Sequence, residues 1–472
     1  MEVGRWEFCG VPVARKRLVL STRGLIGLIL CSAIVTFDGT AVTVALPDIA
    51  RSLGAPFSSL QWITNASLIM VAAFVVPAGA LGDLHGRRRV MRLGLILFAG
   101  ASLGCAAAPS ATWLILLRVL QGAAAALIVP GAVALLRGSY RDEVDRTRAF
   151  GLWAGWSGLA TVVGPVAGGA LADMWSWRAV FVTSAALALL AFWLLAAVPE
   201  SSTERRERVN VTSTIFVVVV LGSLSYALIE GGERWTSPTV LAALAVAAGT
   251  GVLLSRHKRL HSLIPPELGR SRNCVAANGV TAAMYFGLFG LSFLLVIYTQ
   301  GVLGYSATWA GMTVLPMALP MLLSERFGRL TARVGSRLMV TAGVVTAGLG
   351  VVWLTVGPDP LPFWSFIIPG MAVFGTGLSI AISPLTNAAV SSVPADCAGA
   401  ASGVHHAIVR AAGLVAIAAL GTIAAAGGEA GSLSRDGFRT ALLVCAVIVL
   451  LPGVVLARRI RDDDAGGLAE AA

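Results

Sequence analysis

Two charged residues, Asp38 and Arg118, each lie inside a long apolar run of the sequence. A charged side chain is costly to place within such a run, so it usually marks a functional pathway or has a charged partner. Asp38 precedes Pro47, the end of its run, by about 13 Å at 1.5 Å per helical residue. Arg118 lies roughly 9 Å from Thr112, where its run begins, so the two depths are similar.

The chemistry of this pair leaves alternatives open. A carboxylate removed from water can bind and release a proton near neutral pH, but Asp38 could also be a structural acid that is paired permanently with an arginine. Arg118 stays charged and needs a partner, unless its side chain extends outward along the lipid boundary.

The composition is that of a membrane protein. The 472 residues are 57% hydrophobic and 12% charged, whereas a soluble domain carries roughly a quarter charged residues. The net charge of +11 would suit a nucleic-acid partner, but the arginines cluster in short segments between apolar runs, as they do in cytoplasmic loops. We therefore expect a multi-pass protein of the cytoplasmic (inner) membrane, embedded in the lipid bilayer, with both termini in the cytoplasm and no nucleic-acid partner.

The apolar runs predict an all-α polytopic membrane protein of about fourteen helices, each near the ~20 residues that cross the hydrocarbon. They lie near 23–46, 60–81, 90–108, 112–136, 148–172, 178–198, 211–229, 239–255, 274–300, 309–324, 338–356, 363–384, 400–426 and 440–457. The predicted organisation is a cytoplasmic tail (1–22), a six-helix half (23–200), a linker with two extra helices (201–272), a second six-helix half (273–457) and a cytoplasmic tail (458–472).

The loop after the second run carries the most specific pattern of the sequence, GALGDLHGRRRVM at 79–91. It resembles the signature loop of major facilitator superfamily transporters at Gly79, Leu81, Asp83, Gly86, Arg87 and Arg88. The segment 328–337 repeats this loop weakly, with alanine at the acidic position. The resemblance implies two six-helix halves, and the position of the repeat adds two central helices, as in the fourteen-span branch of the drug:proton antiporters.

Three further stretches resemble motifs of the same family. The run 37–47 is similar to its first-span pattern around Asp38, and 114–122 is similar to a motif that contains Arg118 and Gln121. The run 160–169 resembles the antiporter motif of the fifth span, at Ala160, Gly164, Pro165, Gly168 and Gly169. Small residues at every fourth position let helices approach closely, and the proline invites a kink. This resemblance implies antiport and export.

The segment 403–413 resembles a second-half motif of the family, with His406 in place of asparagine and Arg410 four residues later on the same helical face. His406 is either a second proton carrier or a neutral histidine that is hydrogen-bonded within the bundle. Trp153 and Trp156 either line a cavity or pack at the interface, and Gln121 is a third candidate for the cavity lining.

Together these features predict a transporter of the quaternary-ammonium/multidrug resistance type, which exports small, largely apolar or amphipathic compounds in exchange for protons and is functional as a monomer. The alternatives are a proton symporter that imports or exchanges a metabolite and, remotely, a membrane-embedded enzyme. We expect no enzyme activity, metal or cofactor: six scattered cysteines form no metal motif, and no phosphate-binding loop for ATP is present.

Overall fold

The computed structural model describes residues 21–140, 143–201, 211–232, 235–256, 266–394, 397–426 and 435–460. Within these ranges, the regular structure is helical throughout. The first part comprises α1 (Thr22–Leu53), α2 (Phe57–His85), α3 (Arg87–Ala106), α4 (Ala111–Ser139), α5 (Glu143–Met174), α6 (Trp177–Leu194), η1 (Leu195–Ala197), α7 (Val211–Glu230) and α8 (Pro238–Arg256). The second comprises α9 (Pro266–Arg270), α10 (Arg272–Gly301), α11 (Ala307–Met312), α12 (Leu315–Ala318), η3 (Leu319–Leu323), α13 (Ser324–Val334), α14 (Ser336–Thr355), η4 (Phe363–Ile367), α15 (Ile368–Ser391), α16 (Ala398–Ala425) and α17 (Arg435–Ala457).

Twelve helices in the described ranges are long and apolar enough to cross a membrane, against the fourteen that the sequence predicted. The two expected spans that fall short are 239–255 and 309–324. The first has an apolar segment of 17 residues, Pro238–Leu254, which at 1.5 Å per residue reaches about 26 Å, less than the ~30 Å of hydrocarbon. The second is the segment Ala307–Leu323, which is broken into α11, α12 and η3. Pro316 and Pro320 lie at these breaks, and proline removes a backbone donor from a helix.

Two glycines with positive φ show that the predicted internal repeat is real in the backbone. Gly86 joins α2 to α3 with φ 97° and ψ 124°, and Gly335 joins α13 to α14 with φ 93° and ψ 148°. Both values lie in a region that residues with a Cβ atom rarely adopt, so each turn needs glycine. The two positions correspond when 79–88 is aligned with 328–337.

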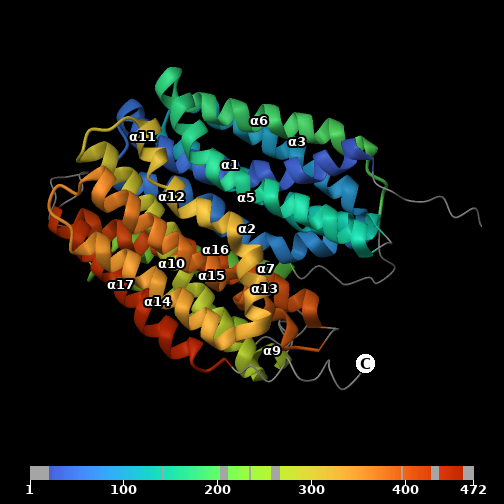
Figure 1. The fold of residues 1–472 in the computed structure, drawn as a ribbon. Coiled ribbons are helices and arrows are strands. Elements are labelled where there is room, and N and C mark those ends of the chain that lie inside the picture. Colours follow the sequence, from blue (N-terminus) through green and yellow to red (C-terminus); the bar gives the residue numbers. More distant parts are fainter. Residues whose placement is uncertain are drawn as a thin grey trace, which may run out of the picture.

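The helices form two bundles that lie side by side in Figure 1. In the first, α1 packs on α5 and α6, and α4 packs on α2 and α3; in the second, α10 packs on α16 and α17, and α14 packs on α15. The two halves meet where α2 packs on α16 and where α5 packs on α11. Helix α7 contacts both α2 and α16, so it covers one side of that junction. The predicted tails at 1–20 and 461–472, and most of the charged segment 201–208, lie outside the described residues.

Candidate functional site

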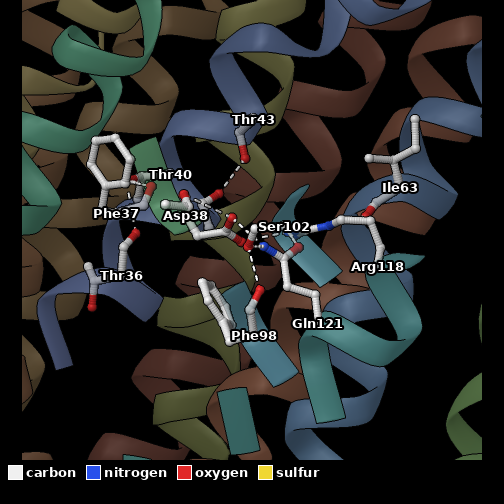
Figure 2. Close-up of polar contacts among 12 residues, drawn as sticks. Thr36, Phe37, Asp38, Thr40, Thr43, Ile63, Phe98, Ser102, Arg118 and Gln121 are labelled. Atoms are coloured by element: carbon white, nitrogen blue, oxygen red, sulfur yellow. Dashed lines mark hydrogen bonds and ion pairs between the residues drawn. The ribbon is translucent and has the colours of Figure 1, made fainter. Parts of the chain in front are cut away.

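Asp38 and Arg118 face each other in the first half. Oδ2 of Asp38, on α1, lies 2.6 Å from Nη1 of Arg118, on α4. Asp38 is 3% exposed and Arg118 is 2% exposed, so the ion pair is shielded from solvent. Figure 2 shows both side chains pointing toward one another across the helices. The depths counted along the sequence are therefore consistent with the observed contact, and the outward-extending arginine is excluded.

The pair lies at the centre of a polar cluster. Gln121 donates from Nε2 to Asp38 Oδ1 at 2.9 Å and to Ser102 Oγ at 2.8 Å, and its Oε1 accepts from Arg118 Nη1 at 2.6 Å. Ser184 donates to Asp38 Oδ1 at 3.4 Å. Arg118 also donates from Nε to the carbonyl of Ile63 at 3.0 Å. These contacts connect α1, α2, α3, α4 and α6, so the state of one carboxylate is linked to the packing of five helices.

The cluster depends on the balance of charge between Asp38 and Arg118. A buried ion pair persists only while both partners keep their charge, and removal of one partner costs about 3–5 kcal/mol because the other charge is left uncompensated. The ion pair therefore ties the packing of α1 to that of α4.

The signature loop is held together by its own charges and by the segment after α6. Asp83 accepts from Arg87 at 2.8 Å (Nε) and 2.7 Å (Nη2), one helical turn later. Arg88 donates from Nη1 to the carbonyl of Val198 at 2.8 Å, and its backbone N–H donates to Glu200 at 2.9 Å. Of the other motif positions, Gly79 lies near Pro130 of α4, and Leu81 is partly buried.

The α5 motif lies at two close helix contacts. A Cβ atom at Gly168 would lie 2.5 Å from Cβ of Ala41, and one at Gly164 would collide with Thr40, so both glycines bring α5 against α1. Gly169 lies against the backbone of Ala307 on α11.

The same stretch of α5 therefore contacts both halves. The carbonyl of Pro165 packs against Gly311, also on α11. Ala160, the first position of the motif, is partly buried.

Hydrogen bonds join the two halves at the end of the molecule where α11 begins. Asp173, at the end of α5, accepts from the backbone N–H groups of Ala307 (3.0 Å) and Thr308 (2.9 Å) and from the Thr308 hydroxyl (2.6 Å). A carboxylate is favourable there because the first N–H groups of a helix have no partner within it. Gln300 on α10 donates to the carbonyl of Val44 on α1 at 2.8 Å.

Two amides of α2 bind α16 in the same manner. Gln61 donates to the carbonyls of Ile417 and Ala418, each at 2.9 Å, and Asn65 donates to the carbonyl of Leu414 at 3.1 Å. These buried amide–carbonyl contacts hold α2 against α16 at this end of the junction between the halves.

In the second half, the structure divides the histidine roles differently from the prediction. His405, not His406, is the histidine that is hydrogen-bonded within the bundle: it is 4% exposed, and its Nδ1 lies 3.0 Å from Oδ1 of Asn278. His406 is exposed, and Arg410, one turn later, is partly exposed. Successive residues point about 100° apart on a helix, so His405 faces Asn278 while His406, whose ring lies 6.0 Å from that of His405, is exposed.

The two predicted cavity tryptophans also differ from each other. Trp153 donates from Nε1 to Ser32 Oγ on α1 at 2.8 Å and makes an edge contact with Phe150. Trp156 is exposed. Gln121, the third residue predicted for the cavity lining, is fully buried within the Asp38 cluster.

The family model described as Major Facilitator Superfamily matches residues 28–418. The chain belongs to the major facilitator superfamily. The fold, and the twelve long apolar helices within the described residues, indicate a multi-pass membrane transporter rather than an enzyme.

Three named relatives in this superfamily are about equally similar to the chain. Multidrug resistance protein Stp of Mycobacterium tuberculosis is 31% identical over 83% of this chain and 74% of its own length. Puromycin resistance protein pur8 of Streptomyces alboniger is 31% identical over 89% and 85%. Methylenomycin A resistance protein of Streptomyces coelicolor is 31% identical over 90% of each. Among solved structures, the peptide transporter POT in complex with sulfate superposes with a TM-score of 0.70 at 16% identity, covering 93% of this chain and 96% of that one, which supports the major facilitator fold alone.

Several polar residues of the site were missed from the sequence. Ser184 is buried against Asp38, Ser102 is buried against Gln121, and Asn278 is buried against His405. A signal existed for Asn278, because an amide in the middle of an apolar run needs a partner. The serines gave none, since a hydroxyl can bond to its own helix backbone, as Ser102 also does with Phe98.

Proposed function

We propose that the protein is a proton-driven antiporter that exports small, largely apolar or amphipathic compounds, such as drugs or antibiotics, across the cytoplasmic membrane. The names of the relatives, which refer to multidrug, puromycin and methylenomycin A resistance, support the class of compound. The resemblance of 160–169 to the antiporter motif supports the direction. The buried Asp38–Arg118 pair supports the proton as the driving ion.

The pair is the observation that carries the proposal. A proton that reaches Asp38 from the acidic side neutralises the carboxylate and releases Arg118 from its ion pair, while Gln121 and the Ile63 carbonyl still bind the guanidinium. The neutral acid is the stable form once its arginine has moved, because a lone buried charge is unfavourable. The proton leaves when the site opens to the cytoplasm, and Arg118 then returns.

The contacts between the halves support a cycle of alternating access. The contacts of Asp173 with α11, and of Gln61 and Asn65 with α16, close the end where α11 begins, which the loop arginines place outside. Opening of that end has to break these hydrogen bonds. Gly169 of the α5 motif and Gly311 of α11 lie at the contact between the halves, so α5 and α11 can separate and close again there without interlocking side chains. Proton binding would then favour one of the two states, open to the outside or open to the cytoplasm, and substrate binding would favour the other.

The finer membrane architecture belongs to the same proposal. We propose that both termini lie in the cytoplasm. We also propose that the two shorter apolar segments, Pro238–Leu254 and Ala307–Leu323, cross the membrane, so that the protein has fourteen spans and belongs to the fourteen-span branch. Continuity of α11, α12, η3 and α13 over Ala307–Val334 supports this for the second segment, since 28 residues exceed the thickness of the hydrocarbon even with breaks. A single chain contains both halves, so a monomer suffices.

The test begins with growth of an efflux-deficient bacterial host that expresses the protein, on a panel that includes puromycin and methylenomycin A. A compound to which resistance rises is then measured in proteoliposomes with an imposed pH gradient. Antiport predicts that the compound accumulates against its gradient in the direction opposite to proton flow and that a protonophore abolishes accumulation. Accumulation in the direction of proton flow would establish the symporter instead, and accumulation that is insensitive to the gradient would refute proton coupling.

A further inference from the structure

Arg410 faces the first half of the protein. Gly403 and Gly421 lie seven residues before it and eleven after it on α16, close to whole numbers of helical turns, so the three share one face. A Cβ atom at Gly403 would contact Val76 of α2 at 3.4 Å, and one at Gly421 would collide with the Gln61 amide, also on α2. Arg410 therefore lies between two points at which α16 meets the other half.

The described residues of α10 and α16 around Arg410 are polar but not acidic. His406 lies one turn away and is exposed, and Tyr285 of α10 lies within electrostatic range of the guanidinium. Neither α10 (Arg272–Gly301) nor α16 (Ala398–Ala425) contains an acidic residue. The acid of α2, Asp83, lies in the signature loop and binds Arg87.

The membrane-embedded acid of the first half cannot compensate this charge. Asp38 is 3% exposed, and its two oxygens accept from Arg118, Gln121 and Ser184. A cation between the halves would thus meet the Arg410 guanidinium at low dielectric, while each carboxylate of α1 and α2 is already paired with an arginine of the first half. An anion would gain charge-assisted hydrogen bonds to the same group.

From this arrangement we infer that the exported compounds are anions, with a carboxylate or an acidic phenol that binds Arg410, rather than quaternary-ammonium cations. The Tyr285 hydroxyl and the His406 ring are further donors near the acidic group, and the aromatic ring of Phe289, which packs near Tyr285, offers an apolar surface for the remainder of the compound. The inference rests on the proposed export function, since it names the substrate class of that function.

The test uses two dyes with the same xanthene skeleton and opposite charge, fluorescein (anionic) and rhodamine 123 (cationic). Binding to the purified, unmodified protein is measured by fluorescence anisotropy. We expect fluorescein to bind about tenfold more tightly, the ratio that one charge-assisted hydrogen bond provides. Equal binding of the two dyes, tighter binding of rhodamine 123, or no measurable binding of fluorescein would overturn the inference without any variant.

Two substitutions then locate the preference. Arg410→Gln should weaken fluorescein binding about tenfold while leaving rhodamine 123 binding unchanged or improved, and Arg410→Lys should keep most of the preference because it keeps the charge. Equal weakening of both dyes by Arg410→Gln would assign the residue to structure and refute its binding role. Dye binding does not depend on a proton gradient, so the two proposals can fail separately. A preserved dye preference without proton-driven transport would refute only the proposed coupling. Proton-driven transport without the dye preference would refute only the substrate class.

Discussion

The hydrogen bonds that Asp173 accepts from the start of α11 hold this end of the two halves together. With the proposed threading this end faces outward, so their loss should shift the protein toward a state that is open to the outside. The carboxylate accepts three hydrogen bonds, from the Ala307 and Thr308 backbones and from the Thr308 hydroxyl. In Asp173→Ala all three are lost from the closed state, whereas the open state, in which the two ends are apart, does not have them to lose. The substitution therefore destabilises the closed state and leaves the open state nearly unchanged.

The size of the shift follows from the exposure of the contact. A typical hydrogen bond contributes about 0.5–1.5 kcal/mol, and the low end applies because Asp173 is exposed, so three bonds amount to about 1.5 kcal/mol. Since about 1.4 kcal/mol is a tenfold change, the ratio of open to closed molecules should rise about tenfold.

Double electron–electron resonance can measure this ratio with spin labels on cysteines at Ala107 and Asp436, which are exposed at the outer ends of the two halves. The longer distance should gain population in Asp173→Ala. Asp48→Ala is the matched control, because Asp48 is a neighbouring carboxylate that pairs with Arg51 within its own helix. Unchanged distances in Asp173→Ala, or the same change in both variants, would refute the closing role of Asp173.

Three further predictions concern packing, the signature loop and threading. Gly168→Val should lower the midpoint of thermal unfolding in detergent, because a Cβ atom there overlaps α1 and overpacking costs about 1–3 kcal/mol. Gly151→Val, at a position with open space on the same helix, should leave the midpoint unchanged. Equal midpoints for the two variants would contradict the close contact. Asp83→Asn should slow turnover roughly fivefold while insertion and substrate binding persist, and unchanged turnover would leave the loop with a topological role alone. A cysteine at Thr236 should react with an impermeant maleimide in intact cells and one at Gly138 only after permeabilisation, relative to the protein without either; the reverse pattern would invert the threading.

Helix positions and charged-residue depths could be predicted from the sequence because both depend on distance along the chain. Counting 1.5 Å per residue placed Asp38 and Arg118 at similar depths, and their side chains are in contact. The repeated loop likewise located the turns at Gly86 and Gly335. Each of these features is local, or follows from the fixed thickness of a bilayer.

Rotation about the helix axis could not be predicted in the same way. The choice between His405 and His406 depends on which face of α16 meets Asn278, and this is decided by packing between distant segments. The difference between fourteen apolar runs and twelve long apolar helices in the described residues has another reason. Apolar length was read without the helix breaks at Pro316 and Pro320, and the run 239–255 contains an apolar helical segment of only 17 residues.

The central claim, that Asp38 couples proton movement to export, is tested most directly by the Asp38→Asn protein in proteoliposomes. Asparagine keeps the shape and cannot titrate, so export against a concentration gradient, driven by an imposed pH gradient, should be abolished, while exchange down a gradient and the folded state persist. Asp48→Asn, on the same helix but outside the buried cluster, should keep uphill transport. Full uphill transport by Asp38→Asn would contradict the account and assign the coupling to another group.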